Sequence, residues 1–159
     1  MISDPKEYKK AAAKAMSLLL AQERTKKDLT DRLLGAGFSK EAANYALEYV
    51  MGYGYVDDLR FAENYLAFHR DKRSRKELRF KLLGKGVPPE VIDRAMEDYC
   101  EEDERAAAAV RLEKRLKGKA LSGMEKKEKE KIMAHLAGKG YPLPIIRQVM
   151  LEREQQEYL

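Results

Sequence analysis

The stretch KLLGKGV at residues 81–87 places a glycine on either side of a lysine. A glycine-rich loop of this kind can cradle phosphate groups with its backbone N–H groups, and in ATP-using enzymes its lysine reaches the phosphates. The same pattern also marks the end of a helix, because glycine adopts the left-handed backbone of a helix C-terminus. The two interpretations predict opposite functions, an ATP-dependent enzyme or a helical binding protein.

The loop recurs along the chain, and this recurrence decides between the two interpretations. Residues 24–50 align with residues 73–99 at a shift of 49, without a gap, and ten of the 27 positions are identical. A third, more distant copy, HLAGKGY, occurs at residues 135–141, at a shift of 54 from the second. Three copies at nearly regular spacing indicate a repeated helical module rather than a nucleotide site.

Acidic residues and histidines offer little for catalysis or metal binding. Asp57 and Asp58 are adjacent and lack a third ligand nearby, so we expect one of them to cap the helix that follows. The run CEEDE at residues 100–104 lacks calcium-loop spacing and is typical of a solvent-exposed helix start. His69 is expected at a core edge, and His135 at a helix end where positive charge is favourable. We therefore predict no catalytic residue, no metal site, no cofactor and no enzymatic activity.

Composition favours a helical binding protein as well. The 159 residues are 44% hydrophobic and 37% charged, and the helix formers Ala, Leu, Lys, Glu and Arg dominate. Cys100 is the only cysteine, which excludes an internal disulfide and a cysteine-based metal cluster. No apolar run is long enough for a signal core or a membrane span, so we expect a cytoplasmic protein without membrane contact. The net charge of +5 suggests a polyanionic partner.

Helix signals divide the chain into three groups of three helices. The capping boxes TKKD and SRKE start the second helix of the first two groups at residues 25–28 and 74–77. Ser39 or a proline pair starts the third helix. The first helices are expected at about residues 6–22, from about residue 58, and at about residues 103–117. The side chains predicted to face the core include Leu29, Leu33, Leu34, Leu78, Leu82, Leu83, Ala106, Ala109, Val110 and Leu116.

We therefore predict an all-α fold of three tandem three-helix repeats, at residues 1–53, 54–101 and 102–159. A module of about fifty residues is barely large enough for its own core. Packing between neighbouring repeats is expected to extend that core into an elongated, curved right-handed or solenoid-like array. The third repeat is irregular, with the lysine-rich insertion KGKALSGMEKKEKEK between its helices. We expect a monomer, because no heptad seam or unused apolar helix face requires a dimer.

Charges alternate in blocks along the sequence. Residues 69–85 are strongly basic, residues 90–104 carry eight acids and one base, and residues 111–131 are basic again. Ion pairs on solvent-exposed helix faces explain any single charge. The basic cluster at residues 73–76 instead lies at a turn and helix start, where cations oppose the helix dipole, so a polyanion or an acidic protein surface would stabilise it. The predicted contact residues are Arg70, Lys72, Arg73, Arg75 and Lys76, followed by Arg79, Lys81, Arg24, Lys26 and Lys27.

The stretches GYVDDLRFAENYL at residues 54–66 and SRKELRFKLLGKGV at residues 74–87 resemble the RecX family of bacterial recombinase regulators. That family has a Gly-Tyr-x-Asp-Asp-x-Arg-Phe-Ala block that leads into its second helical repeat. The resemblance covers about residues 11–153 and is weaker in the third repeat, where Ala137 replaces a leucine. The residues that match the block are Gly54, Tyr55, Asp57, Asp58, Arg60, Phe61 and Ala62.

The resemblance implies a protein of three-helix repeats that binds the RecA recombinase. RecX-like proteins lie along the groove of the RecA–DNA filament or block its growth, and so restrain ATP hydrolysis and strand exchange. The implied partners are the RecA filament and, through weak electrostatic attachment, DNA. Within this resemblance, the block at residues 57–62 is expected to pack and cap the junction between repeats, while the exposed basic residues make the contacts.

Two other functions fit parts of the sequence. Two helices joined by a short glycine turn also describe a helix-turn-helix motif, so a stand-alone DNA-binding protein is the alternative. Against it, the candidate recognition helices at residues 39–51 and 89–99 are poor in base-reading side chains. A scaffold that binds only proteins through its acidic blocks is a third possibility.

Overall fold

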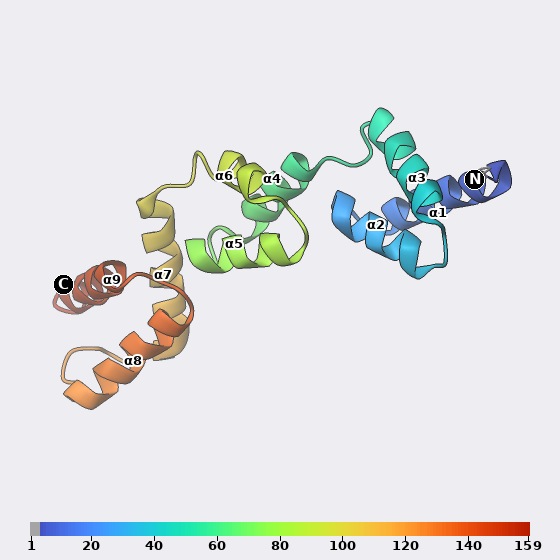
Figure 1. The fold of residues 1–159 in the computed structure, drawn as a ribbon. Helices are drawn as coiled ribbons and strands as arrows, with labels where there is room; N and C mark the ends of the chain where they lie inside the picture. Colours follow the sequence, from blue (N-terminus) through green and yellow to red (C-terminus); the bar gives the residue numbers. More distant parts are fainter. Residues whose placement is uncertain (1–3) are drawn as a thin grey trace. The chain divides into compact units, whose positions relative to one another are not determined.

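The computed structural model describes residues 4–159, and every regular element in this part of the chain is an α-helix (Figure 1). The all-α prediction is confirmed. The helices predicted from residues 6 and 103 begin slightly earlier, at Pro5 and Glu101. None of the described helices is both long and apolar enough to span a lipid bilayer. The nine helices of the described residues are α1 (Pro5–Ala21), α2 (Lys26–Gly35), α3 (Lys40–Gly52), α4 (Asp58–His69), α5 (Arg75–Gly84), α6 (Pro89–Ala95), α7 (Glu101–Leu116), α8 (Lys126–Gly138) and α9 (Leu143–Gln156).

The chain packs into two compact units. The N-terminal unit comprises the chain up to Asn64 together with Leu82–Met96, and the C-terminal unit comprises Tyr65–Lys81 together with Glu97–Leu159. The division passes through α4 and α5, which belong to the second predicted repeat. The boundaries proposed for three repeats therefore stay a prediction.

Local hydrogen bonds explain where the helices begin and end. The side-chain oxygens of Thr25, Ser39 and Ser74 each accept a backbone N–H three residues ahead, at 3.1 Å, so all three predicted caps are confirmed. Gly86 has a φ of +93°, in the left-handed region that favours glycine. The Gly-Lys-Gly loop is therefore the end of α5, as the repeat predicted.

The core of the N-terminal unit lies between α1, α2 and α3. Alanines on α1 and α3 let these two helices approach closely, and leucines of α2 close the cluster. Leu34 was predicted to face inward, but its side chain is 42% exposed because it lies about 100° around α2 from the buried Leu33. Leu83 of α5 was also predicted to face inward, but its side chain is 45% exposed. The buried cluster consists of Ala11, Ala15, Leu29, Leu33, Ala42, Ala43, Ala46, Val50 and Val56.

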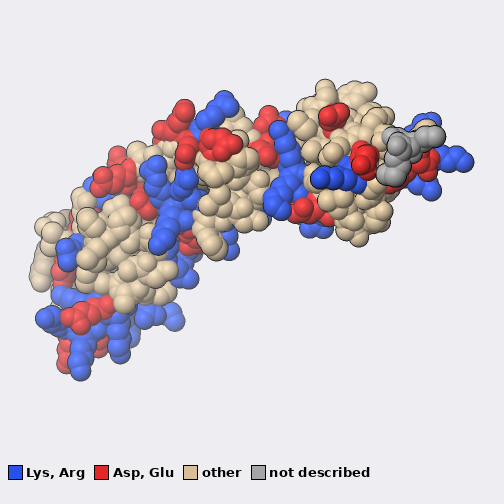
Figure 2. Space-filling view, viewed as in Figure 1, with Lys and Arg blue, Asp and Glu red and all other residues tan. Residues whose placement is uncertain are grey.

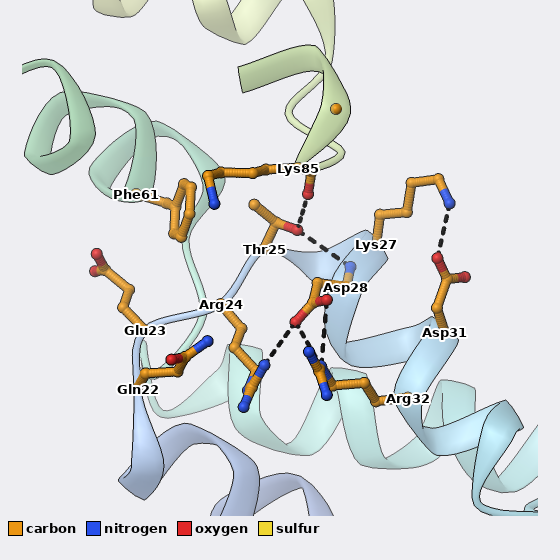
Figure 3. Close-up of a pocket in the computed structure, with 11 residues that line it drawn as sticks. Gln22, Glu23, Arg24, Thr25, Lys27, Asp28, Asp31, Arg32, Phe61 and Lys85 are labelled. Atoms are coloured by element: carbon orange, nitrogen blue, oxygen red, sulfur yellow. Dashed lines mark hydrogen bonds and ion pairs between the residues drawn. The ribbon is translucent and has the colours of Figure 1, made fainter. Parts of the chain in front are cut away.

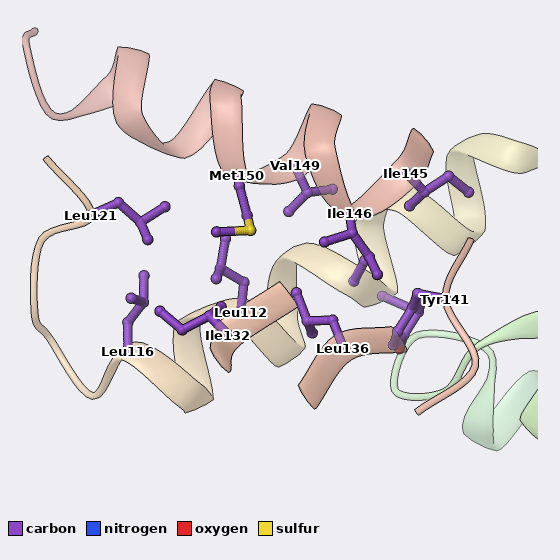
Figure 4. Packing of buried hydrophobic residues seen from close by; sticks show 12 residues of the cluster. Leu112, Leu116, Leu121, Ile132, Leu136, Tyr141, Ile145, Ile146, Val149 and Met150 are labelled. Carbon is purple, nitrogen blue, oxygen red and sulfur yellow. The ribbon is translucent and has the colours of Figure 1, made fainter. Parts of the chain in front are cut away.

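The core of the C-terminal unit is larger and lies between α7, α8 and α9, whose apolar side chains point toward one another (Figure 4). Ala108, Leu112 and Leu116 follow one another at four-residue spacing along the buried face of α7. The prediction that Ala106, Ala109 and Val110 face inward is wrong, because these three residues lie on the exposed side of this helix. The cluster is completed by Ala107, Leu121, Ile132, Leu136, Tyr141, Ile145, Ile146, Val149 and Met150.

Candidate nucleic-acid interface

The residues that resemble the family block lie at the start of α4 in the N-terminal unit. Asp57 accepts a hydrogen bond from the Arg60 backbone N–H at 3.1 Å and so caps α4. The Arg60 guanidinium donates to the Gly54 carbonyl at 2.9 Å and lies 3.5 Å from a carboxylate oxygen of Glu23. Ala62 is fully buried. These side chains hold the turn between α3 and α4.

Asp58, the second acid of the block, has a different partner. Its side chain is buried and accepts the backbone N–H of Lys26, at the start of α2, at 2.9 Å. Next to this contact the Thr25 hydroxyl donates to the Lys85 carbonyl at 2.5 Å, and Gly86 follows at the end of α5. We call Thr25, Lys26, Asp58, Lys85 and Gly86 the first junction. It joins the start of α2 to the start of α4 and the end of α5.

The C-terminal unit contains the same arrangement one repeat later. The Ser74 hydroxyl donates to the Lys139 carbonyl at 2.7 Å, and Glu104 accepts the Arg75 backbone N–H at 2.8 Å. These residues, with Gly140, form the second junction. Burial raises the pKa of Glu104, whereas the hydrogen bond from Arg75 lowers it. The acidic run at residues 100–104 is therefore not simply a solvent-exposed helix start, as had been predicted.

Arg70, one of the predicted contact residues, is engaged within the C-terminal unit. Its guanidinium lies 3.2 Å from Asp103 and 3.4 Å from Asp98, and stacks 5.6 Å from the centre of the Tyr99 ring. Asp103 also accepts the Cys100 backbone N–H at 2.9 Å, and this bond is the main reason that its pKa is lowered. Arg70 thus anchors the chain ahead of α5 to the start of α7.

Arg73 is held in place as well. Its guanidinium donates to the Tyr65 hydroxyl at 2.5 Å and lies 3.5 Å from Glu77. Arg111 approaches from α7, donates to the Lys72 carbonyl at 3.2 Å and lies 3.6 Å from the same Glu77 carboxylate. The loop between α4 and α5 is therefore fixed by three arginines, of which the sequence had suggested two as contact residues.

Four other predicted contact residues expose their side chains: Lys72, Arg75, Lys76 and Lys81. The Lys72 ammonium lies 4.3 Å from the centre of the Phe68 ring, and the Arg75 guanidinium lies 5.7 Å from the Tyr99 ring. Such contacts orient a cation while leaving it in reach of a ligand. Arg79 is half-buried. We refer to Lys72, Arg75 and Lys76 as the exposed cations.

Two of the predicted contact residues of the N-terminal unit, Arg24 and Lys27, line a hollow of about 250 Å³ (Figure 3). Arg24 is 8% exposed, and its guanidinium donates to Asp28 at 3.0 Å, so it is not accessible as a contact residue. Asp28 also binds Arg32, and Lys27 pairs with Asp31 at 2.8 Å. Lys26 is half-buried. Because acids accompany the cations throughout this hollow, it is poorly suited to phosphate.

A second hollow, of about 320 Å³ in the C-terminal unit, has a stronger positive charge. Arg115, Lys117, Lys119 and Lys131 line it, with Glu128 as the only acid, and Leu116, Met124 and Ile132 contribute apolar atoms. Lys and Arg side chains gather over α8 in Figure 2. We call these four cations the basic hollow. The sequence signal for it was the basic block at residues 111–131, which includes the lysine-rich insertion, although no contact residue was predicted there.

His135, on α8, is also influenced by nearby cations, including Arg115 of the basic hollow. Burial lowers its pKa, and Arg115, Lys139 and Arg111 lower it further. Because burial and these cations disfavour the protonated imidazole, the expectation that a positive charge is favourable at His135 is wrong. An anion is the ligand that this environment favours.

Family models and known protein sequences match most of the chain. Residues 62–98 match the family model for the first three-helix domain of RecX, and residues 101–150 match the model for its third three-helix domain. The "Regulatory protein RecX" of Prosthecochloris aestuarii is 30% identical over 148 residues, which cover 92% of this chain and 95% of that protein. The protein of the same name from Bacillus licheniformis is 33% identical over 154 residues, which cover 94% of this chain and 57% of that longer protein.

The fold agrees with a solved structure of the same name. The crystal structure of RecX from Lactobacillus salivarius superposes with a TM-score of 0.82 over 94% of this chain and 98% of the other, at 20% sequence identity. This similarity supports the all-α helical fold, while the sequence matches establish the relationship. The chain therefore belongs to the RecX family, whose members are regulatory proteins and not enzymes.

Proposed function

We propose that this protein binds the RecA nucleoprotein filament and restrains its ATP hydrolysis, its growth and DNA strand exchange, and thereby regulates recombination and DNA repair. The observation that carries the proposal is membership of the RecX family, together with a relative named as a regulatory protein that matches over 95% of its length. We place its action in the cytoplasm of a bacterium, since all the named relatives are bacterial. We further propose that it acts as a monomer.

The second part of the proposal is that cations of the C-terminal unit bind DNA phosphates within the filament. Lysine and arginine side chains that neutralise phosphates release condensed counterions, which makes the contact sensitive to salt. The exposed cations and the basic hollow supply such groups. Arg70 and Arg73 have a supporting role, because their ion pairs fix the loop that presents Lys72 and Arg75.

A binding experiment separates this function from the alternative of a stand-alone DNA-binding protein. The fluorescently labelled full-length protein is titrated with bare single-stranded DNA, with RecA alone, and with RecA filaments assembled on the same DNA with a slowly hydrolysed ATP analogue. We expect the filament to bind at least about tenfold more tightly than bare DNA. Bare-DNA affinity should fall steeply as salt rises. Equal affinity for filament and bare DNA would support the alternative.

A further inference from the structure

Five tyrosines form a continuous row on the N-terminal unit. Tyr8 stacks on Tyr45 with ring centres 4.9 Å apart, and Tyr45 stacks on Tyr49 at 6.4 Å. Tyr49 meets Tyr53 edge to face at 5.2 Å, and Tyr53 stacks on Tyr55 at 5.6 Å. We call these five residues the tyrosine row. It runs from α1 along α3 into the turn that follows α3.

The tyrosine row is exposed to solvent rather than part of the core. Tyr45 and Tyr49 are each 41% exposed, Tyr55 is 47% exposed and Tyr53 is 62% exposed. Tyr8, the fifth member, is half-buried and packs against the buried cluster. A contiguous exposed surface of aromatic side chains is unusual in a soluble protein and typically marks a binding site.

The rings of the tyrosine row hold one another in place. Tyr45 has a neighbouring ring on either side, and the Tyr53 hydroxyl is close enough to raise the pKa of Tyr49. Tyrosine loses little conformational entropy on binding because only two side-chain torsions are fixed, and rings that are already stacked lose less. The row is therefore preorganised for a partner.

Acidic residues accompany the tyrosine row. Glu41 and Glu48 are exposed and lie four residues before and three residues after Tyr45, so both adjoin that ring on the surface of α3. Lys40, in the first turn, is the only cation of this helix. Figure 2 shows mostly uncharged surface over α3, with acidic side chains among it. The charge that α3 contributes beside the row thus favours a cationic ligand.

We propose that the tyrosine row binds a protein segment that carries arginine or lysine beside apolar side chains. On the basis of the proposed function, the segment belongs to the RecA subunits of the filament, whereas the cations of the C-terminal unit contact its DNA. Tyrosine faces and edges accept apolar groups and cations, and tyrosine with arginine dominates the binding energy of many interfaces. Glu41 and Glu48 would pair with the cations of the segment.

A nucleic-acid strand suits the tyrosine row less well. Bases stack on free aromatic faces in a positively charged groove. Here Tyr45 is already stacked against two other tyrosines, and Glu41 and Glu48 would repel the phosphates. The chemistry of the row therefore matches a protein partner.

The first test removes the aromatic rings. In Tyr45→Ser/Tyr49→Ser/Tyr53→Ser we expect filament affinity to fall by about tenfold or more, while affinity for bare single-stranded DNA changes by less than about twofold. The control is Leu20→Ser/Tyr158→Ser, which removes two exposed apolar side chains outside the row. Unchanged filament affinity in the tyrosine variant would overturn the inference, and a loss limited to bare DNA would assign the row to nucleic acid.

The second test keeps the rings and reverses the flanking charge. Glu41→Lys/Glu48→Lys should weaken filament binding and leave bare-DNA binding equal or tighter, because added lysines attract phosphates. Tighter binding to both would contradict a cationic protein segment. If the unmodified protein does not bind the filament at all, the proposed function fails, and with it the assignment of the segment to RecA. If it binds and both variants bind equally well, only the inference about the tyrosine row fails.

Discussion

The Thr25 hydroxyl donates a hydrogen bond to the Lys85 backbone carbonyl across 60 residues of sequence, and Ser74 repeats this relationship with Lys139. Each hydroxyl also accepts an N–H of its own helix start. One small side chain therefore starts a helix and attaches it to the end of another. Because the two junctions use corresponding positions of the repeat, the fold connects successive helix groups by the same chemistry twice.

The first prediction concerns the hydroxyl of Thr25. Thr25→Val keeps the shape of this buried residue but removes both hydrogen bonds, so we expect a loss of about 2 kcal/mol in the free energy of unfolding. Thr30→Val is the control, because the Thr30 hydroxyl bonds only to the Lys26 carbonyl within its own helix. It should cost less than about 0.5 kcal/mol. Urea unfolding measures both, and equal losses would show that the junction adds nothing to stability.

The second prediction uses two glycines with the same backbone conformation. Gly37 and Gly86 have φ values of +96° and +93°, so replacement by alanine strains both by about 1–2 kcal/mol. A Cβ at Gly86 would also lie only 2.5 Å from the Lys27 Cβ, whereas one at Gly37 would meet no atom within 4 Å. Gly86→Ala should therefore destabilise the protein by about 1–3 kcal/mol more than Gly37→Ala. Equal midpoints in thermal or urea unfolding would contradict the close packing at the first junction.

The junctions show how far the sequence predicts the fold. Thr25 and Ser74 were recognisable as helix caps, because capping depends on residues only three positions apart. The carbonyls that their hydroxyls bind lie 60 and 65 residues away, and no local pattern identifies them. Asp58 was recognised as part of a motif, but its partner Lys26 emerged only from the structure.

A sequence difference among the three helix groups has a clear physical effect. Glu7, Asp58 and Glu104 each lie four residues before a fully buried alanine in the first helix of their group. Glu7, however, accepts the Ser39 backbone N–H at 2.7 Å within its own helix group. The residues that correspond to Ser39 are Pro88 and Pro142, which have no N–H. In those groups the acid can instead accept a backbone N–H at the start of a helix in the preceding group. Proline at this position therefore accompanies the acids that form the junctions.

The third prediction concerns pH. The Ser122 hydroxyl and the Leu121 backbone N–H bind Glu157 and lower its pKa from 4.5 to about 2. A carboxylate with a lowered pKa stabilises the fold above its unfolded pKa, and this stabilisation is lost as pH falls from about 4.5 toward 2. Glu157→Gln should therefore lose less stability between about pH 5 and about pH 2.5 than the unmodified protein does. The control is Glu130→Gln on the exposed side of α8. If the free energy of unfolding depends on pH in the same way in both variants, Glu157 is not the source of the acid sensitivity.

The fourth prediction tests the exposed cations. Lys72→Glu/Arg75→Glu/Lys76→Glu should fold normally, because exposed substitutions usually cost less than about 0.5 kcal/mol each. It should inhibit RecA at least about tenfold less effectively if phosphate contacts contribute to filament binding. Lys9→Glu/Lys10→Glu/Lys14→Glu on the exposed surface of α1 makes the same change in net charge. If both variants inhibit equally, net charge rather than position governs the effect.

The fifth prediction concerns the basic hollow. Lys119→Gln/Lys131→Gln removes two of its four cations without adding negative charge. The slope of log affinity against log salt for bare single-stranded DNA should become shallower by about 0.7 for each phosphate contact that is lost. A change in affinity with an unchanged slope would show that these lysines do not contact phosphate. Fluorescence anisotropy over a series of salt concentrations gives both quantities.

The candidate site was predicted only in part, for a physical reason. The sequence identified the basic block at residues 69–85 but could not distinguish Arg70 and Arg73, which are held by acids and a tyrosine, from Lys72 and Lys76, which are exposed. Arg70 is held by Asp98 and Asp103, which lie 28 and 33 residues away in sequence. Arg73 is held by Glu77 and Tyr65, and no sequence pattern shows that these contacts form while Lys72 and Lys76 stay exposed. The tyrosine row was missed although Tyr45, Tyr49 and Tyr53 stand at four-residue spacing, which places them on one face of a helix. Tyr8 and Tyr55 lie outside α3, and only the structure shows that they extend the row.

The central claim is tested most directly by single-stranded-DNA-dependent ATP hydrolysis by RecA, titrated with this protein. Our account predicts that hydrolysis falls as the protein is added. Inhibition at far less than one protein per several RecA subunits would favour blocked filament growth, whereas inhibition only near one protein per several subunits would favour coating of the groove. Hydrolysis that stays unchanged at saturating protein, while binding to bare DNA is still measurable, would contradict the account.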